Sequence, residues 1–373
     1  MSIVKSCSKN YDYLIVGAGV FGSVCAWELT KQGYSCLVID RRNHIAGNCY
    51  TELVDGIHVH KYGAHIFHTN SKILWDYVNQ FAVFKPYNHT VVAVYKDEVY
   101  PLPFNLWTFN KLWGVTDPEK AQSLLDLQKY VGEITNLEQQ AKSLVGTDLY
   151  NILIKGYTEK QWNKSCDQLP ASIIKRIPVR MDWNTSYFND LYVGIPEGGY
   201  TPVFEKMLSK ADTLLGSDYF ENKQYYNSLA KNIIYTGPID RLFEYVYGNL
   251  EYRSLTWDTK TLKTDNFQGT SVVNYTDKDV PYTRIIEHKW FDYSRTANTV
   301  VSYEYPAEYS VTKEPYYPVR DNKNTELYNR YADLAVNLNN FYLGGRLANY
   351  VYYDMHQVIA EALSLVKKLK EKK

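Results

Sequence analysis

The first forty residues alternate between apolar runs and glycines in a pattern typical of a strand–helix–strand unit. The apolar run Tyr13–Val16 ends at Gly17, which predicts a buried parallel strand. A helix is predicted over Val20–Lys31, closed by Gly33, and the apolar run Cys36–Ile39 predicts a second strand. The chain therefore begins with a βαβ unit.

The region from about 105 to 162 has helical rather than strand character. Asp117 is a predicted N-cap with Pro118 at the first helical position, and Asn136 is a predicted N-cap for a second helix. Asp148 is expected to begin a third helix. This region is interpreted as a helical insertion.

Strand patterns dominate from about 251 to 317, in the strings TSVVNY, TRIIEH and TVVSYEY, and predict a largely antiparallel sheet. The nucleotide-domain pattern returns near Tyr328, where the short run Phe341–Leu343 precedes two glycines and the helical pattern Met355–Leu369. The first and last segments are therefore expected to meet in space.

These patterns predict an α/β protein with a Rossmann-like nucleotide-binding domain, a helical insertion domain and an antiparallel sheet domain. We expect residues 1–85, 190–248 and 328–373 to form the nucleotide-binding domain. Residues 104–175 form the predicted helical domain, and residues 86–103 with 249–327 form the predicted sheet domain.

Composition and charge exclude several function classes. The chain has 373 residues, is 45% hydrophobic and 22% charged, and is expected to be a soluble globular protein. Lys plus Arg and Asp plus Glu both total 41, so the chain carries no net positive charge that would favour binding to nucleic acid or to an anionic membrane. We see no signal peptide, and no segment has the roughly 18 apolar residues of a membrane helix.

The five cysteines show no paired CxxC spacing. This argues against a disulfide framework or a structural zinc site and favours the reducing cytoplasm. The 36 tyrosines offer flat faces and hydroxyls useful for nucleotides and sugars, although most are expected to be packing residues.

The turn after the first strand carries a GxGxxG motif. Gly17 permits the tight turn, Gly19 lets the backbone approach a pyrophosphate, and Gly22 lets the helix pack against the strand. Asp40, at the end of the second strand, is placed to accept hydrogen bonds from a ribose. We predict dinucleotide binding; the alternative is a purely structural glycine turn.

The element Leu343-Gly-Gly-Arg346 bears on which dinucleotide binds. Small residues between a late strand and a helix suit a flavin ring lying against the backbone, and a helix N-terminus there stabilises negative charge on reduced flavin. This favours FAD over NAD.

Several longer strings are more specific than the glycine motif. They are HKYGAHIFHT (60–69), KGYTEKQW (155–162), LPASIIKRIPVR (169–180), YFN (187–189), VPYTR (280–284), PYYP (315–318), GGRL (344–347) and YYDM (352–355). In order and spacing the chain resembles the prokaryotic UDP-galactopyranose mutase family, from residue 11 to about 365. The resemblance implies a Rossmann-like FAD domain, a helical domain and a twisted antiparallel sheet, with the active cleft between them.

The resemblance also implies a set of cofactor-binding residues for FAD, which must be reduced for activity. They are Gly17, Gly19, Val20, Phe21, Gly22, Asp40, Arg41, Asn48, His65, Ile66, His68, Arg346, Tyr352, Asp354 and Met355. His65 and His68 flank the isoalloxazine by resemblance. Metal ligation by this pair is the weaker alternative, since the segment is not convincingly helical and no third ligand completes a site; structural histidines are the other alternative.

On the substrate side, the resemblance implies contacts to a UDP-sugar. Arg176, on a mobile loop around 165–188, and Arg284 hold the diphosphate, for which a planar guanidinium is well suited; the alternative for each arginine is a surface ion pair. Tyr157 stacks on uracil, and Asn274 contacts the sugar. The full predicted set is Tyr157, Thr158, Trp162, Arg176, Tyr187, Asn274, Arg284, Tyr317, Tyr352 and Asp354.

The implied reaction interconverts UDP-galactopyranose and UDP-galactofuranose without net redox change. By resemblance, N5 of reduced flavin attacks the anomeric carbon and displaces UDP, and the sugar ring reopens and recloses. Arg176, Arg284 and His68 are the predicted catalytic residues, and a homodimer is expected.

This chain departs from the family pattern near both ligands. Ala46 stands where the family has glycine, Asn163 follows Trp162 where glycine is common, and Leu153 and Ile154 replace aromatics. These departures leave other sugar nucleotides open as substrates, namely UDP-N-acetylgalactosamine, UDP-arabinopyranose or dTDP-fucose. An ordinary FAD oxidoreductase and a non-catalytic nucleotide-sugar binder are further alternatives.

Overall fold

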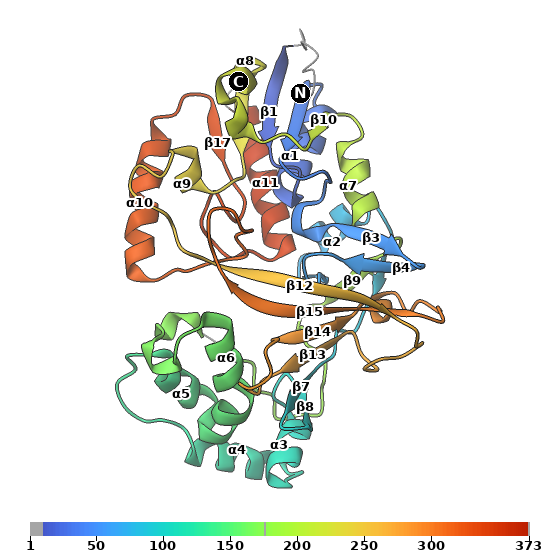
Figure 1. Ribbon diagram of the computed structural model, residues 1–373, viewed down its shortest axis with the longest axis vertical. Helices are drawn as coiled ribbons and strands as arrows, with labels where there is room; N and C mark the ends of the chain where they lie inside the picture. The colour runs from blue at the N-terminus through green and yellow to red at the C-terminus, as the bar shows by residue number, and fades with distance from the viewer. Residues whose placement is uncertain (1–9, 175–176, 372–373) are drawn as a thin grey trace.

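A parallel sheet forms one end of the protein in the computed structural model, which describes residues 10–174 and 177–371 (Figure 1). Its five strands lie in the order β10-β2-β1-β11-β17. Their bounds are Tyr11–Val16 (β1), Cys36–Asp40 (β2), Asp212–Leu215 (β10), Ala230–Tyr235 (β11) and Phe341–Leu343 (β17). The predicted meeting of the first and last segments is thus confirmed by the pairing of β11 with both β1 and β17.

Helices cover both faces of this sheet. On one face, Ile15 of β1 packs in a core with α1 (Val20–Lys31), α7 (Thr201–Leu208) and α11 (Met355–Glu371). On the other face, Leu14 packs with residues around α8 (Lys223–Ser228). The predicted βαβ unit is confirmed, with α1 at its predicted bounds.

A seven-stranded sheet crosses the middle of the molecule in the order β16-β12-β15-β14-β13-β7-β8 (Figure 1). All neighbours are antiparallel except β13 and β7, which are parallel. The bounds are Val91–Tyr95 (β7), Glu98–Leu102 (β8), Tyr252–Leu262 (β12), Val272–Tyr275 (β13), Arg284–Glu287 (β14), Thr299–Glu308 (β15) and Tyr317–Pro318 (β16). The three predicted strands in this region are confirmed as β13, β14 and β15.

The helical layer lies beyond this sheet. It comprises α3 (Leu106–Trp113), α4 (Pro118–Leu127), α5 (Leu137–Leu149), the π-helix η2 (Tyr150–Ile154) and α6 (Lys155–Trp162). Asp117 and Asn136 cap α4 and α5 as predicted, accepting from the backbone N–H groups of Lys120 and Gln139.

The prediction that a third helix begins near Asp148 is confirmed. Gly146, whose φ of 75° only glycine adopts easily, divides α5 into two helices, and the second begins directly after Gly146 and continues through η2 into α6. In the first turn of this helix, the Asp148 carboxylate accepts hydrogen bonds from Trp113 Nε1 and Gln128 Nε2, both at 2.9 Å. Tertiary hydrogen bonds therefore hold the start of the helix.

Smaller elements connect the layers. A three-stranded sheet has the order β5-β9-β6, and β3 pairs with β4. The bounds are Thr51–Val54 (β3), Ile57–His60 (β4), Phe67–Thr69 (β5), Phe84–Pro86 (β6), Tyr192–Pro196 (β9), Lys72–Val78 (α2), Ile239–Leu242 (α9) and Asn322–Val336 (α10), with 3-10 turns at Gly47–Cys49 (η1), Cys166–Gln168 (η3), Ala171–Ile173 (η4), Tyr219–Glu221 (η5) and His288–Phe291 (η6). Because α10 begins at Asn322, the domain boundary expected at 327/328 falls inside a helix.

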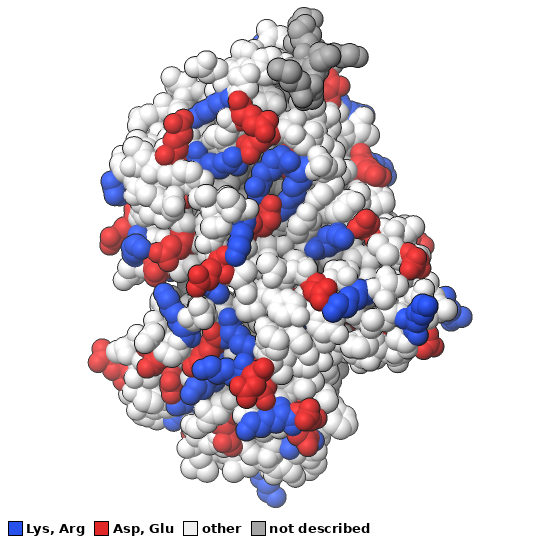
Figure 2. Space-filling view, viewed as in Figure 1, with Lys and Arg blue, Asp and Glu red and all other residues white. Residues whose placement is uncertain are grey.

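The predicted fold class is confirmed: a Rossmann-like parallel sheet, a helical layer and a largely antiparallel sheet form one α/β protein. Among the described residues, no helix combines the length and apolar character needed to cross a membrane. Figure 2 shows acidic and basic side chains interspersed over one face, as the balanced composition leads one to expect.

Candidate active site

A cavity of about 960 Å³ lies between the parallel sheet and the seven-stranded sheet. All of the residues predicted to bind the cofactor line it. Of the predicted substrate residues, the cavity is lined by Tyr187, Asn274, Arg284, Tyr317, Tyr352 and Asp354. Tyr157, Thr158 and Trp162 lie outside its lining, and Arg176 lies outside the described residues.

The glycine motif brings α1 close to the strand that precedes it. Gly17 has a φ of +115°, and a Cβ on Gly22 would lie 1.9 Å from the carbonyl oxygen of Gly17. Gly19, the N-cap of α1, has no side-chain cap. The first N–H groups of α1 therefore remain available to a phosphate at the cavity wall.

Asp40 is fixed at the end of β2 by two backbone donors. Its Oδ2 accepts from the N–H of Ala18 at 2.8 Å, and its Oδ1 accepts from the N–H of Arg42 at 2.9 Å. Both bonds hold the carboxylate beside the glycine turn, where it lines the cavity. The predicted position of Asp40 at the end of the second strand is confirmed, and its contact with a ribose stays a prediction.

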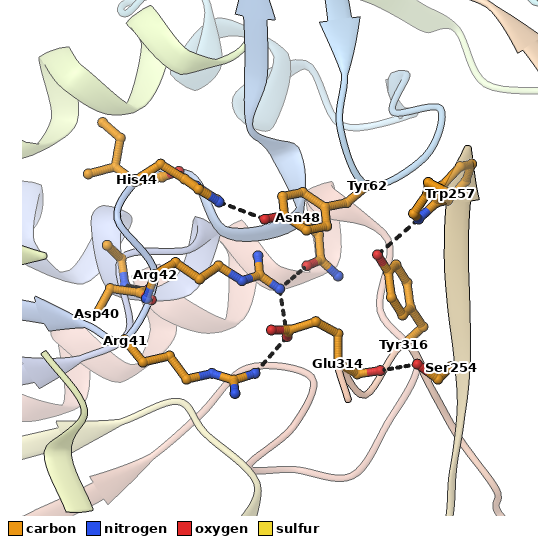
Figure 3. A network of polar contacts seen from close by, with 12 residues as sticks. Asp40, Arg41, Arg42, His44, Asn48, Tyr62, Ser254, Trp257, Glu314 and Tyr316 are labelled. Carbon is orange, nitrogen blue, oxygen red and sulfur yellow. Dashed lines mark hydrogen bonds and ion pairs between the residues drawn. The ribbon is translucent and has the colours of Figure 1, made fainter. Parts of the chain in front are cut away.

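An ion-pair network beside Asp40 joins the segment after β2 to the connection between β15 and β16 (Figure 3). Glu314 Oε2 accepts from Nη2 of Arg41 and from Nη2 of Arg42, each at 2.7 Å. Arg42 also donates to Asn48 Oδ1 at 2.9 Å and lies over the ring of Tyr62 at 4.3 Å. Burial works against both charges, but the pairing prevails, lowering the pKa of Glu314 and raising that of Arg42.

The segment that carries Glu314 is held at several further points. Ser254 Oγ donates to the carbonyl of Glu314 at 2.7 Å, and Trp257 Nε1 donates to the hydroxyl of Tyr316 at 3.1 Å (Figure 3). Arg346 Nη2 donates to the carbonyl of Tyr316 at 2.8 Å. The next residue is Tyr317, so the network positions a predicted substrate residue as well as the cofactor side.

The two histidines of the sequence motif have different environments. His65 Nδ1 donates to the carbonyl of Gly63 at 2.8 Å, and burial lowers the pKa of His65 to about 4, so the ring is neutral. His68 Nδ1 lies 2.9 Å from Asp190 Oδ2, and its ring stacks on Phe188 with centroids 3.9 Å apart.

His68, Asp354 and His356 have ligand atoms within 4.8 Å of one another, close enough to share a metal ion. His68 and Asp354 line the cavity where the flavin ring is predicted, and Asp190 already occupies one nitrogen of His68. We propose no metal there.

Three polar residues form one row across the seven-stranded sheet. Arg284 of β14 pairs directly with Asn274 of β13 on one side and with Glu304 of β15 on the other. Directly opposed residues project from the same face of a sheet. All three line the cavity, so the register of three strands builds this wall.

Arg284 is the cation of that row. Its Nε forms an ion pair with Glu304 Oε1 at 3.2 Å without hydrogen-bond geometry, and its Nη2 donates to the hydroxyl of Tyr157 at 2.6 Å. Burial works to lower the pKa of Arg284, but the Glu304 carboxylate together with the hydroxyls of Tyr157 and Tyr317 outweighs burial and raises it. The guanidinium is thus permanently charged and held from two sides at the cavity wall.

The tyrosines predicted to contact phosphates gather at the cavity's open side. The rings of Tyr317 and Tyr352 stack with centroids 5.9 Å apart, and the Arg346 guanidinium lies 4.7 Å from the Tyr352 ring centroid. Tyr187 and Tyr352 are 43% and 54% exposed, and both line the cavity.

Sequence reasoning missed His89 and Glu304. His89 lines the cavity, its Nδ1 is buried without a hydrogen-bond partner, and burial, followed by Arg284, lowers its pKa to about 3. It sits in no recognisable motif. Glu304 lies in the string TVVSYEY, but only the strand register reveals that it faces Arg284.

The expected substrate loop is anchored along its second half. The N–H of Arg180 donates to the carbonyl of Phe104 at 2.9 Å, and the N–H of Leu106 donates to the carbonyl of Asp182 at 2.9 Å. The N–H of Tyr187 donates to the carbonyl of His89 at 2.7 Å, which places Tyr187 beside that histidine.

This fold and site define a protein of the Rossmann type whose cavity has a second wall built around the Arg284 guanidinium. The model of the NAD(P)-binding Rossmann-like domain matches residues 15–81, and the UDP-galactopyranose mutase model matches residues 152–352. A Klebsiella pneumoniae protein named "probable UDP-galactopyranose mutase" is 39% identical over 95% of this chain and 94% of its own length. The chain therefore belongs to the UDP-galactopyranose mutase family.

Two further similarities extend the comparison. The dTDP-fucopyranose mutase of Escherichia coli is 35% identical over 94% of this chain and 96% of its own length. A crystal structure of reduced UDP-galactopyranose mutase superposes with a TM-score of 0.76 and covers 98% of this chain and 94% of that chain. At 14% identity the last similarity supports the fold alone.

Proposed function

We propose that this protein interconverts UDP-galactopyranose and UDP-galactofuranose with reduced FAD as its cofactor. The observation that carries the proposal is one cavity in which the glycine-motif wall faces the row Asn274–Arg284–Glu304 and the tyrosines Tyr317 and Tyr352. A dinucleotide and a second anionic ligand can therefore meet there. The family membership supports the same activity.

The residues present fit FAD. The uncapped start of α1 suits the pyrophosphate, and Asp40 suits a ribose. Gly344 lies against the Phe21 ring so closely that a Cβ there would come within 2.0 Å of it, and Gly345 has a φ of +86°. This glycine pair lets the late turn lie flat beside α1, where a side chain would intrude.

Reduced FAD would supply the nucleophile, its N5, for the anomeric carbon of the sugar. The protein's own residues bind and orient the substrate. Arg284 would neutralise the diphosphate as negative charge grows on departing UDP, and Tyr317 and Tyr352 would donate hydroxyl hydrogen bonds to phosphate oxygens without adding charge. Asn274, whose buried Oδ1 has no partner, would accept from a sugar hydroxyl.

Arg176 is proposed as the second diphosphate-binding arginine, delivered by the 165–188 loop. Tyr157, Thr158 and Trp162 would form the nucleoside end of the site after that loop closes. His68, fixed by Asp190, would orient the sugar against the flavin. Closure would exclude water, which could otherwise hydrolyse the activated sugar.

A second candidate substrate is dTDP-fucose, favoured by the 35% identical dTDP-fucopyranose mutase. It differs from UDP-galactose in the base methyl group, in the missing ribose 2'-hydroxyl and in the missing hydroxyl at the sugar C6. UDP-N-acetylgalactosamine and UDP-arabinopyranose are the other alternative substrates for the same sugar-ring interconversion. An ordinary FAD oxidoreductase would not require a diphosphate-binding arginine such as Arg284.

The test is chromatography of UDP-galactopyranose incubated with FAD-loaded protein, with and without dithionite. We expect a UDP-galactofuranose peak only with reduced protein. Absence of product from reduced, FAD-loaded protein would contradict UDP-galactose as substrate, and dTDP-fucose in parallel reactions would then test the second candidate. A steady consumption of dithionite coupled to product would instead indicate an oxidoreductase.

We further propose a homodimer in the cytoplasm, on the resemblance to the family. The described cysteines Cys25, Cys36, Cys49 and Cys166 are all buried free thiols, which supports a reducing compartment. Light scattering of the purified protein tests the dimer.

A further inference from the structure

The ammonium group of Lys160 makes three of the hydrogen bonds that dock helix α6 on the sheet. Lys160 Nζ donates to the carbonyls of Tyr275, Val280 and Tyr282 at 2.7, 3.0 and 2.9 Å. These carbonyls belong to the turn between β13 and β14 (residues 276–283) and the residues that flank it, so the ammonium binds both arms of the turn. Figure 1 shows α6 beside the ends of these two strands.

The same contact is close and polar along its length. A Cβ on Gly156 would lie 2.3 Å from the carbonyl oxygen of Thr276, and Thr276 Oγ1 donates to the carbonyl of Ile152 at 2.8 Å. At the other end of α6, Arg253 Nε donates to the carbonyl of Gln161 at 2.8 Å. Glycine therefore permits the approach, and side-chain donors fix it.

The docked elements carry the two halves of the proposed nucleotide site. Tyr157 and Trp162 are on α6, whereas Asn274 lies two residues before the turn and Arg284 directly follows it. The 2.6 Å bond from Arg284 Nη2 to the Tyr157 hydroxyl joins the halves directly. A shift of α6 relative to the turn would lengthen this bond and allow the Arg284 guanidinium to rotate.

We infer that Lys160 is a positioning residue, which acts on the nucleotide through Tyr157 and Arg284 without touching it. This inference rests on the proposed function. The Lys160 ammonium fixes α6 on the turn, and the fixed Tyr157 hydroxyl keeps Arg284 aimed at the diphosphate.

The charges around Lys160 are compatible with this role. Burial lowers the pKa of Lys160 to about 8 and Asp277 acts in the opposite direction, so the ammonium is charged at neutral pH. The three backbone carbonyls compensate the charge of the Lys160 ammonium. A neutral side chain without donors would leave these carbonyls without hydrogen-bond partners.

The chain offers a matched control in Lys289. Its ammonium likewise donates to three backbone carbonyls, those of Asp265, Thr296 and Asn298, at 2.5, 2.9 and 3.4 Å. Lys289 is 5% exposed and does not line the cavity. Lys289→Met therefore removes the same kind of ammonium cage away from the site.

The experiment compares FAD-loaded wild type, Lys160→Met, Lys160→Arg and Lys289→Met. UDP binding is titrated by the change in tryptophan and flavin fluorescence, steady-state kinetics gives KM and kcat, and hydrogen exchange of residues 155–163 and 275–284 is followed without nucleotide. We expect Lys160→Met to weaken UDP binding at least tenfold, to raise KM more than it lowers kcat, and to speed exchange of both segments. Lys160→Arg should restore most of the affinity.

Lys289→Met should leave UDP affinity and exchange of these segments unchanged, even if it lowers Tm. Unchanged UDP affinity in Lys160→Met, or equal losses in both Met variants, would overturn the inference alone. A wild type that binds no UDP contradicts the proposed function, and the inference then falls with it. If Lys160→Met does not fold, the test uses Lys160→Arg, which keeps the charge and should keep most of the UDP affinity. A UDP affinity of Lys160→Arg as low as that of Arg284→Ala would overturn the positioning role of the Lys160 ammonium.

Discussion

Glu314 reaches across the cavity to Arg42 and binds it at 2.7 Å, and the same carboxylate oxygen binds Arg41 (Figure 3). The arginines follow Asp40 at the end of β2, whereas Glu314 lies in the connection between β15 and β16. The ion pair therefore ties the predicted adenosine side of the cofactor site to the segment that ends at Tyr317. Under the proposed function, this clasp (Arg41, Arg42 and Glu314) would contribute both to cofactor retention and to substrate positioning.

We predict that Glu314→Gln releases FAD faster. The substitution keeps the shape of the side chain but removes its charge, leaving Arg42 largely buried without its carboxylate. Because the Glu314 side chain is 32% exposed, we discount the effect to about 1–2 kcal/mol, or roughly a tenfold weaker FAD complex. The recovery of free-FAD fluorescence after dilution measures it.

The control for Glu314→Gln is Glu52→Gln. Glu52 forms an exposed ion pair with Lys61 at 3.0 Å, away from the clasp. It should leave the rate of FAD release unchanged. Equal release rates for Glu314→Gln and wild type would show that the clasp does not hold the cofactor.

Arg284→Lys is expected to weaken UDP binding while preserving the charge. Lysine cannot bind the Tyr157 hydroxyl and a diphosphate from one planar group. Loss of a charge-assisted hydrogen bond of about 1.5–3 kcal/mol predicts roughly a 10- to 100-fold rise in the dissociation constant. Isothermal titration with UDP measures this rise, and an unchanged constant would remove Arg284 from the proposed diphosphate site.

Asn274→Leu should separate stability from function. The buried Oδ1 of Asn274 has no hydrogen-bond partner, so replacing the amide with an apolar side chain of similar size should raise or preserve Tm. The same change should raise KM for the UDP-sugar about 3- to 10-fold, since a neutral hydrogen bond contributes about 0.5–1.5 kcal/mol. A fall in Tm with an unchanged KM would assign Asn274 a structural role only.

How much of this could be predicted from the sequence depends on how local the signal was. The helix Val20–Lys31, the caps Asp117 and Asn136, and the strands around Asn274, Arg284 and Glu304 follow from patterns within a few residues of each element. The sequence of β12 is too polar to stand out as a strand, and its long pairing with β15 was therefore not predicted. Periodicity identifies elements but does not pair them.

The site divides in the same way. The motif residues Gly17 to Gly22 and Asp40 could be placed from chain order alone, because the βαβ unit is a local structure. His89, Glu304 and Glu314 could not, since each acts through a partner far away in the chain: Tyr187, Arg284 and Arg42. Sheet register and loop packing, which bring them together, are not written in any single segment.

Buried neutral histidines should make the protein sensitive to mild acid. Burial lowers the pKa of His65 to about 4 and of His288 to about 3, well below an unfolded value of about 6.5. At pH values between the folded and the unfolded pKa, the unfolded state binds more protons than the folded state. The free energy of unfolding therefore falls as the pH falls below about 6.5. Each such histidine contributes about 1.4 kcal/mol per pH unit.

His288→Gln isolates one of these contributions. His288 Nδ1 accepts from the N–H of His60 at 3.2 Å and its Nε2 donates to Ser302 Oγ at 2.7 Å, and a glutamine offers one acceptor and one donor for the same partners. Urea unfolding of FAD-loaded protein at pH 6.5 and 5.5 gives the pH slope, in a window where carboxylates contribute little. Because the window begins at the unfolded pKa, where half of the unfolded imidazoles are already protonated, we expect the variant to lose about 1 kcal/mol less than the wild type between these two pH values. Parallel slopes would mean that His288 takes up no proton on unfolding, and the acid sensitivity would then have to come from the other buried histidines.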